Sequence, residues 1–254
     1  MSNLKSRLKN GEQILGTMVN IVDHPDFVKI FKTCGFDYFI IDCEHGYMEY
    51  SKAAAMIALA KEMNIAALIR IPQASRECIM RFMEMGADGL MLPNTDTAEQ
   101  ARQMVSYAKY APLGNRGISM MRGHNGYVPV ASPIEYMKKA NEETLLIAQI
   151  ESAQSIRNIE EILSVDGIDI AFMGPNDLCQ NLGIFGQQDN PLYIESLEKV
   201  IAASKKAGKY CGTHGMNASA LKKWITKGMA FNLYSNEVSM LMNDAQAAIR
   251  TLKG

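Results

Sequence analysis

Short apolar segments alternate with longer amphipathic segments along the whole chain. Eight apolar segments, of four to six residues, have the length of buried strands: Gly16–Ile21, Tyr38–Asp42, Ala66–Ile71, Gly89–Pro93, Leu145–Ile150, Ile168–Met173, Tyr210–Thr213 and Phe231–Tyr234. Each is followed by a segment in which apolar residues recur at helical spacing: Pro25–Cys34, Tyr50–Glu62, Arg76–Met85, Thr97–Tyr110, Ser155–Leu163, Pro191–Lys206, Ala218–Lys227 and Glu237–Leu252. The pattern predicts eight strand–helix repeats.

Eight strand–helix repeats in 254 residues predict an α/β fold, a (β/α)₈ TIM barrel. No break in composition divides the chain, so we expect one domain over residues 1–254. An open doubly wound sheet is the alternative fold. The first strand is not followed by the GxGxxG motif, which weakens the dinucleotide-binding version of that alternative.

Two connections stand out from the repeats. The segment Ala111–Glu143 contains PLGNRGISMMRGHNGYVPVASP, rich in Gly, Pro and Asn, and we expect a long irregular loop. Gly183–Asn190 is a second loop. Either can close over the mouth of the barrel or contact a neighbouring subunit.

The charge balance argues against nucleic-acid and membrane-surface partners. The chain has 26 basic and 27 acidic residues, a net charge of −1, and no basic run. Its apolar segments are far shorter than the ~20 residues of a membrane span. The first residues, MSNLKSRLKNGEQ, contain no apolar signal core, so we expect a cytoplasmic protein. The five cysteines are scattered singly, as is typical of reduced thiols.

Two acidic residues follow the ends of predicted strands, Glu151 after Leu145–Ile150 and Asp177 after Ile168–Met173. Parallel strands bring both carboxylates to one edge of the sheet, where α/β proteins keep their chemistry. Two hard oxygen ligands with room for water and substrate are typical of a Mg²⁺ or Mn²⁺ site. The alternative is that both residues only cap the helices that follow.

Other chemically capable residues also lie at strand ends. His45, in DCEHG after the second strand, can act as a general base tuned by a nearby carboxylate, or can be a structural histidine. Arg70, in LIRIP, needs an anionic partner, either a substrate carboxylate or enolate, or a salt bridge to Glu44. Gly174, in FMGPND, lets the backbone approach a ligand, or serves an ordinary turn. His214 is a weaker candidate for substrate contact.

Together, these groups suit a metal-dependent aldol reaction. A divalent ion, an Arg and helix N–H groups can bind a 2-oxo acid and stabilise the enolate formed when a C–C bond breaks, while a His moves a proton. A Schiff-base aldolase needs a Lys inside the barrel, and none of the eight predicted strands contains one. We expect Asp96 or Thr97, in LPNTDT, to cap a helix.

The chain resembles the HpcH/HpaI aldolases, a family of pyruvate-dependent class II aldolases that includes 4-hydroxy-2-oxo-heptanedioate aldolases. The resemblance runs nearly from end to end and rests on six motifs in order: GFDYFIIDCEHG, LIRIP, GADGLMLPNTDTAEQA, PLGNRGIS, AQIESAQSIRNIEEIL and VDGIDIAFMGPNDLCQNLG.

The resemblance implies a carbon–carbon lyase that cleaves a 4-hydroxy-2-oxo acid to pyruvate (or a close 2-oxo acid) and an aldehyde. It implies a TIM barrel in a homohexamer, a trimer of dimers that exchange the C-terminal helix. For the site it implies the following residues: metal ligands Glu151 and Asp177, for Mg²⁺, Mn²⁺ or Co²⁺; acid–base His45, supported by Glu84; Arg70 on the enolate oxygen; pyruvate contacts from Gln149, Gly174 and Pro175.

The chain departs from the family pattern at four places. The first strand reads GTMVN, where a Trp is common. Glu84 stands where an Asp is expected. The segment Ser119–Val130 lacks the usual Ala/Arg-rich form, and we expect Arg122 and His124 within it to face the aldehyde. Asn236–Glu237 replaces an Asp near the last strand. Two rivals remain: an acyl-CoA lyase of the citrate lyase β type, and a non-catalytic barrel that binds a 2-oxo acid.

Overall fold

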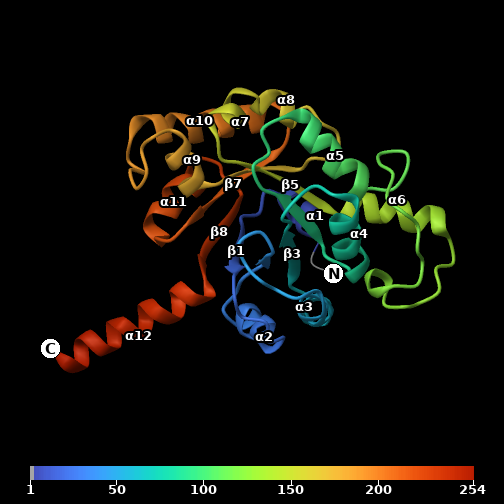
Figure 1. Ribbon diagram of the computed structural model, residues 1–254, viewed down its shortest axis with the longest axis horizontal. Helices are drawn as coiled ribbons and strands as arrows, with labels where there is room; N and C mark the ends of the chain where they lie inside the picture. The colour runs from blue at the N-terminus through green and yellow to red at the C-terminus, as the bar shows by residue number, and fades with distance from the viewer. Residues whose placement is uncertain (1–2) are drawn as a thin grey trace.

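A computed structural model describes residues 3–254 and shows a closed barrel of eight parallel strands in chain order (Figure 1). The strands are β1 (Ile14–Val19), β2 (Tyr38–Asp42), β3 (Ala66–Arg70), β4 (Gly89–Leu92), β5 (Leu145–Ile150), β6 (Ile170–Met173), β7 (Tyr210–Gly215) and β8 (Phe231–Asn236). Strand β8 pairs with β1 through a register shift and closes the barrel. The fold is therefore the predicted (β/α)₈ TIM barrel, and the open sheet is excluded.

Helices surround the barrel (Figure 1). They are α1 (Leu4–Lys9), α2 (Asp26–Thr33), α3 (Tyr50–Met63), α4 (Arg76–Met85), α5 (Ala98–Ala108), α6 (Pro133–Glu143), α7 (Ala153–Arg157), α8 (Ile159–Leu163), α9 (Pro175–Asn181), α10 (Pro191–Lys206), α11 (Ala218–Thr226) and α12 (Glu237–Lys253). A short 3₁₀ turn, η1, covers Gly123–Asn125. No helix in the described range 3–254 is long and apolar enough to cross a bilayer.

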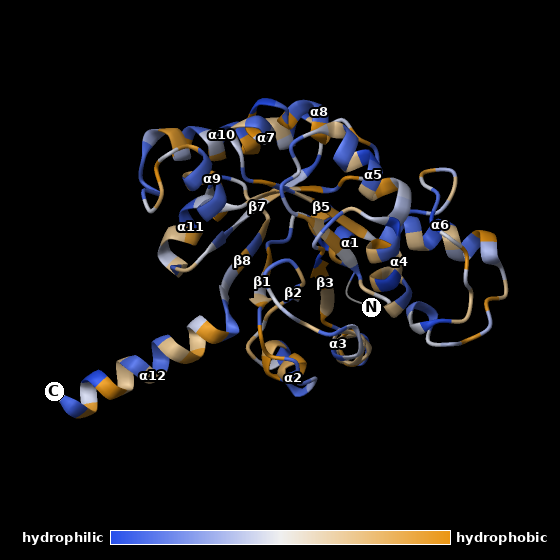
Figure 2. Cartoon of the chain, viewed as in Figure 1, coloured by the Kyte–Doolittle hydropathy of each residue, from blue (hydrophilic) through white to orange (hydrophobic). Residues whose placement is uncertain are grey.

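Alternation along each strand separates an inner core from an outer one. Side chains such as Tyr38, Leu68 and Phe231 fill the inside of the barrel, where the rings of Tyr38 and Phe231 stack with centroids 4.3 Å apart. Strands β3 and β5 are mainly orange, that is apolar, in Figure 2, as expected for strands that are buried on both faces. The interior is thus a packed core rather than a channel.

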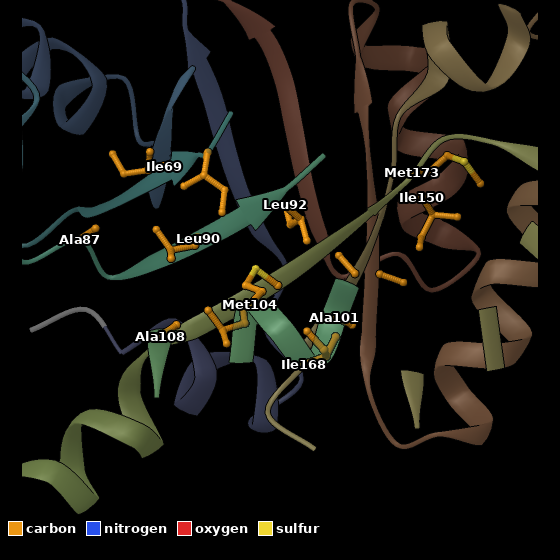
Figure 3. Packing of buried hydrophobic residues seen from close by; sticks show 14 of the residues in the cluster. Ile69, Ala87, Leu90, Leu92, Ala101, Met104, Ala108, Ile150, Ile168 and Met173 are labelled. Carbon is orange, nitrogen blue, oxygen red and sulfur yellow. The ribbon is translucent and has the colours of Figure 1, made fainter. Parts of the chain in front are cut away.

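The outer core lies between the strands and the helices. Leu90 and Leu92 of β4 belong to the same buried cluster as Ala101, Met104 and Ala108, which recur at helical spacing on α5 (Figure 3). Thr97 begins α5 with a capping box to Gln100, which confirms Thr97 as the predicted cap.

The prediction for Ala111–Glu143 is only partly right. Its last third forms helix α6, which Ser132 caps and Pro133 begins, as is common at the first helical position. The prediction missed this helix because the Gly-, Pro- and Asn-rich residues before it were extended into one loop as far as Glu143. The predicted helix Ser155–Leu163 is divided into α7 and α8 at Asn158.

Helix α12 extends away from the barrel (Figure 1). Its apolar side chains include Leu241 and Leu252, which are 72% and 80% exposed. A helix with this much uncovered apolar surface fits the predicted exchange between subunits, and the exchange stays a prediction.

Barrel closure leaves no room for a side chain at Gly212 of β7. A Cβ there would overlap the carbonyl oxygen of Phe231 on β8. Because that oxygen belongs to a paired backbone, it cannot move aside easily, so we expect Gly212→Ala to cost about 3 kcal/mol or more. Thermal and urea unfolding measure this. Gly117→Ala is the control, since its new Cβ would have neighbours no closer than 3.4 Å; equal stabilities of the two variants would contradict the packing described.

Candidate functional site

The strand period continues from the barrel core to its mouth. Residues Tyr38 and Ile40 of β2 face inward, so Asp42, two residues further, does so as well. The same step of two leads from Leu68 to Arg70 on β3, and from Ile147 to Gln149 on β5. The carboxyl ends of the strands thus close the apolar core with a layer of polar side chains.

A buried ion pair joins β2 and β3 in this layer. Asp42 and Arg70 are register partners, and the guanidinium donates from Nε to Asp42 Oδ1 at 2.9 Å and from Nη2 to Oδ2 at 2.7 Å. Arg70 Nη1 lies 3.1 Å from Glu44 Oε2. Burial lowers the pKa of Arg70, but its bonds and charge pairing with Asp42, together with the charge of Glu44, outweigh burial and raise the pKa. The salt bridge to Glu44 is confirmed, and Asp42 adds a second partner.

Glu151 is also deeply buried at the mouth, at 3% exposure. Its Oε1 accepts the backbone N–H of Asn94 at 2.6 Å, and its Oε2 accepts Nε2–H of Gln149 at 2.6 Å. Burial raises the Glu151 pKa to about 7; the bond from Asn94 opposes the shift, and the charges of Asp177 and Glu44 add to it. The carboxylate is therefore held in place but costs free energy when it is ionised without a cation.

The absence of a side chain at Gly174 leaves room for the carboxylate of Glu151. A Cβ on Gly174 would overlap Glu151 Oε2 and would lie 2.9 Å from Gln149 Nε2. The glycine therefore admits the carboxylate, a protein group, where the sequence predicted close approach of a ligand. Beside it, Gln149 Oε1 is buried and has no hydrogen-bond partner. Such an orphaned acceptor needs a donor or a cation from outside the chain.

The net charge at the mouth is negative. The charge of Asp177, exposed in the first turn of α9, acts on both Glu151 and Glu44. The charges of Asp42, Glu44 and Glu151 act on the guanidinium of Arg70, so these four acids have one arginine among them. Within residues 3–254, no three His, Cys, Asp or Glu side chains form a metal cluster. The chain can thus offer a cation two carboxylates, Glu151 and Asp177, and the amide oxygen of Gln149, all oxygen donors suited to a hard divalent ion.

His45 lies at the rim of this acidic mouth. Its side chain is 68% exposed, and Nε2 is 3.8 Å from Glu44 Oε2. The backbone N–H groups of Glu44 and His45 both donate to Asp42 Oδ1, at 3.0 and 3.3 Å. The ion pair of Asp42 therefore also fixes the turn that carries the histidine.

Glu84 is not brought to His45 within one chain. Its carboxylate lies 3.5 Å from Arg122 Nε and 3.9 Å from His124 Nε2. Burial raises its pKa, against the charges of Arg116 and Arg122. The supporting role that the resemblance implies for Glu84 stays a prediction.

Arg122 and His124 lie at the opposite end of the barrel from His45. Gly86, which ends α4, packs beside His124, and a cavity of about 550 Å³ is lined by both His124 and Asp88. Asp88 immediately precedes β4 and so marks the amino-terminal ends of the strands. Within its own chain, the segment Ser119–Val130 does not face the mouth, contrary to the expectation that these two residues contact the aldehyde.

His214 is better placed than the sequence suggested. It follows Tyr210 and Gly212 at a step of two on β7 and therefore faces the mouth, with Nε2 3.1 Å from the carbonyl oxygen of Ser235. Burial lowers its pKa, the bond to Ser235 opposes this, and the charge of Arg70 lowers it further. The period of two along β7 is the sequence signal that could have identified His214 as a residue that faces the mouth.

Comparisons with known proteins agree with this architecture. The model of the family HpcH/HpaI aldolase/citrate lyase matches residues 20–243. A hydroxypyruvate/pyruvate aldolase of Roseovarius nubinhibens is 29% identical, covering 99% of this chain and 95% of the relative. A 4-hydroxy-2-oxovalerate aldolase of Novosphingobium aromaticivorans is 34% identical, covering 82% of this chain and 79% of the relative.

Among solved structures, an HpcH/HpaI aldolase from Desulfitobacterium hafniense DCB-2 superposes with a TM-score of 0.95. It is 35% identical, and the match covers 98% of this chain and 96% of that one.

The raised pKa of Glu151 gives a pH dependence of stability. Between its ordinary value of 4.5 and the folded value of about 7, the folded state binds the proton that the unfolded state has lost. The free energy of unfolding of the metal-free protein should therefore fall, through Glu151, as the pH rises from 4.5 to 7, and this contribution should be constant above 7.

Melting curves in EDTA from pH 5 to 8 measure this dependence. Glu151→Gln should lack the slope and should be more stable than the native chain at pH 8. Asp177→Asn should keep most of the slope, because burial is the largest cause of the raised Glu151 pKa and the charge of Asp177 only adds to it. Parallel curves for the native chain and Glu151→Gln would show that the Glu151 pKa is not raised.

Proposed function

The chain belongs to the HpcH/HpaI aldolase/citrate lyase family, and on that basis we propose that it is a divalent-metal-dependent aldolase. The enzyme is a carbon–carbon lyase. Its proposed substrate is a 4-hydroxy-2-oxo acid, cleaved to pyruvate or a close 2-oxo acid and an aldehyde, with the reverse condensation. The observation that carries the proposal is the buried Glu151 and the orphaned Gln149 oxygen in an acidic mouth that also holds one arginine.

Glu151 and Asp177 are the proposed metal ligands. A divalent cation would compensate the cost of an ionised, buried Glu151 and would offset the four acids around one guanidinium. Oxygen donors suit Mg²⁺, Mn²⁺ and Co²⁺ alike. When bound, the ion acts as a Lewis acid on the oxygen atoms of the 2-oxo acid.

Arg70, Gln149 and the backbone at Gly174 and Pro175 are the proposed contacts for the 2-oxo acid. Asp42 and Glu44 hold the guanidinium of Arg70 in place, so it needs no rearrangement when negative charge develops on the keto oxygen. Gln149 already bonds Glu151 through Nε2, which leaves its Oε1 for a donor in the site. These groups bind and orient the acid and stabilise the enolate.

His45 is the proposed acid–base. Its imidazole can take the proton from the 4-hydroxyl group as the C3–C4 bond breaks. The oxygen electrons then form the aldehyde carbonyl, and the electron pair of the broken bond passes to the enolate. A proton returned to C3 completes the 2-oxo acid. The exposed position of His45 at the rim suits a group that meets an aldehyde entering from solvent.

The two rival functions predict different binding. An acyl-CoA lyase must bind the phosphates of CoA, whereas the mouth carries four acids and one arginine. A non-catalytic barrel would bind a 2-oxo acid without changing it. Stable capture on immobilised CoA would favour the first rival.

A homohexamer, a trimer of dimers that exchange α12, is part of the proposal. The exposed Leu241 and Leu252 support it, because a solvent-exposed helix with such side chains gains stability when a second copy covers it.

Exchange of the pyruvate methyl protons with solvent deuterium tests the function without knowledge of the aldehyde. We expect proton NMR to show loss of the methyl signal when Mg²⁺ or Mn²⁺ is added, and no loss in EDTA. This result would indicate that the protein forms the enolate. Absence of exchange with every metal would count against pyruvate as the nucleophile.

Substitutions separate the proposed roles. Glu151→Gln and Asp177→Asn should each abolish metal-dependent cleavage and weaken metal binding measured by calorimetry. His45→Ala should slow cleavage by about 10²- to 10⁴-fold, the usual contribution of a general acid–base, with metal affinity nearly unchanged. Full activity of His45→Ala would show that another group moves the proton.

A further inference from the structure

The first residue of α12, Glu237, has a buried carboxylate that the proposed mechanism does not use. It is 6% exposed, although it begins a helix that otherwise extends into solvent. Its Oε1 accepts three consecutive backbone N–H groups: Asn20 at 2.7 Å, Ile21 at 2.7 Å and Val22 at 3.2 Å. A helix can begin without three charge-assisted hydrogen bonds to one carboxylate oxygen, so these bonds indicate a further structural role for Glu237.

The three N–H groups belong to the segment that leaves β1 at the carboxyl end of the barrel. This segment packs directly against the turn that carries His45. A Cβ placed on Gly46 would lie 2.8 Å from the carbonyl oxygen of Asn20 and would overlap that of Asp42. Gly46 is thus enclosed by backbone on both sides, and His45 precedes it.

Two carboxylates therefore hold the His45 turn. From within the barrel, Asp42 binds the N–H groups of Glu44 and His45. From outside, Glu237 fixes residues 20–22, which support Gly46. The imidazole itself is 68% exposed and its nearest acid is 3.8 Å away, so its position depends on the backbone of its turn.

We propose that Glu237 is a positioning residue that holds the backbone beneath His45 through residues 20–22. This inference rests on the proposed function only for its effect on catalysis; the mechanical link between Glu237 and the turn stands on the contacts alone. Misplacement of a reacting group by about 1 Å can cost 100-fold in rate. We expect Glu237→Ala to lower kcat by about 10- to 100-fold, with KM for the 2-oxo acid and metal affinity changed less than about threefold.

The variants include a rescue and a control. Glu237→Gln keeps an oxygen that can accept the N–H groups and should restore kcat to within about threefold of the native value. Asp169→Ala removes a comparable carboxylate at the other end of the barrel, where Oδ2 accepts the N–H of Leu146 at 2.9 Å. It should lower the melting temperature without lowering kcat.

Hydrogen–deuterium exchange measured on peptides tests the link independently of activity. In Glu237→Ala, peptides covering residues 19–23 and 43–47 should exchange faster; in Glu237→Gln and Asp169→Ala they should not. Unchanged exchange at 43–47 would overturn the inference, as would faster exchange with native kcat. If Glu237→Ala does not fold, Glu237→Asp takes its place: the shorter side chain should produce the same pattern.

The two proposals fail in different ways. If the native chain cleaves no 2-oxo acid with any metal, the proposed function is wrong, and the exchange measurements still decide whether Glu237 holds the His45 turn. If cleavage is normal and kcat of Glu237→Ala equals that of the native chain, the function stands and the positioning role is wrong.

Discussion

The buried ion pair of Asp42 and Arg70 is the interaction on which the mouth of the barrel depends. It joins the ends of two neighbouring strands with two short hydrogen bonds, and its Asp42 also anchors the turn that carries His45. Removal of one member of such a pair typically costs about 3–5 kcal/mol, because the other charge remains buried alone. Because separation of the two charges costs this much free energy, the pair fixes the orientation of the arginine before any substrate binds.

Beyond this pair, the mouth carries more negative charge than the chain itself neutralises. Glu151 is buried among Asn94, Gln149 and Gly174, and its pKa is raised to about 7. A barrel optimised only for stability would place an amide or an apolar group there, because burial of an unpaired carboxylate is costly. Unfavourable burial that a cation can relieve is typical of a binding site rather than of a structural contact.

The two ends of the barrel carry different groups of polar residues. The carboxyl ends of the strands carry His45, Arg70 and Glu151, while the long segment after α5 lies at the amino-terminal ends with Glu84, His124 and Asp88. Glu237 connects the carboxyl end to α12, the helix on which Leu241 and Leu252 are exposed. The arrangement that holds the His45 turn thus begins at the same residue as the helix proposed for exchange between subunits.

The strand–helix repeats, the barrel class and the strand ends that carry Glu151, Asp177, His45 and Arg70 could all be predicted from the sequence. They could be predicted because strand period and helix period are local properties, and because parallel strands bring their carboxyl ends to one edge. Helix α6 was missed because the Gly, Pro and Asn residues before it led us to extend the predicted loop as far as Glu143, although Ser132 and Pro133 form a helix-start signal.

The contacts between side chains could not be predicted without the three-dimensional arrangement of the chain. Asp42 meets Arg70, Asn94 holds Glu151, Glu84 faces Arg122 instead of His45, and Glu237 bonds residues 20–22. These pairs lie 28 to 217 positions apart in the chain. Such contacts follow from strand register, barrel closure and the path of the loops, which no local pattern in the sequence encodes.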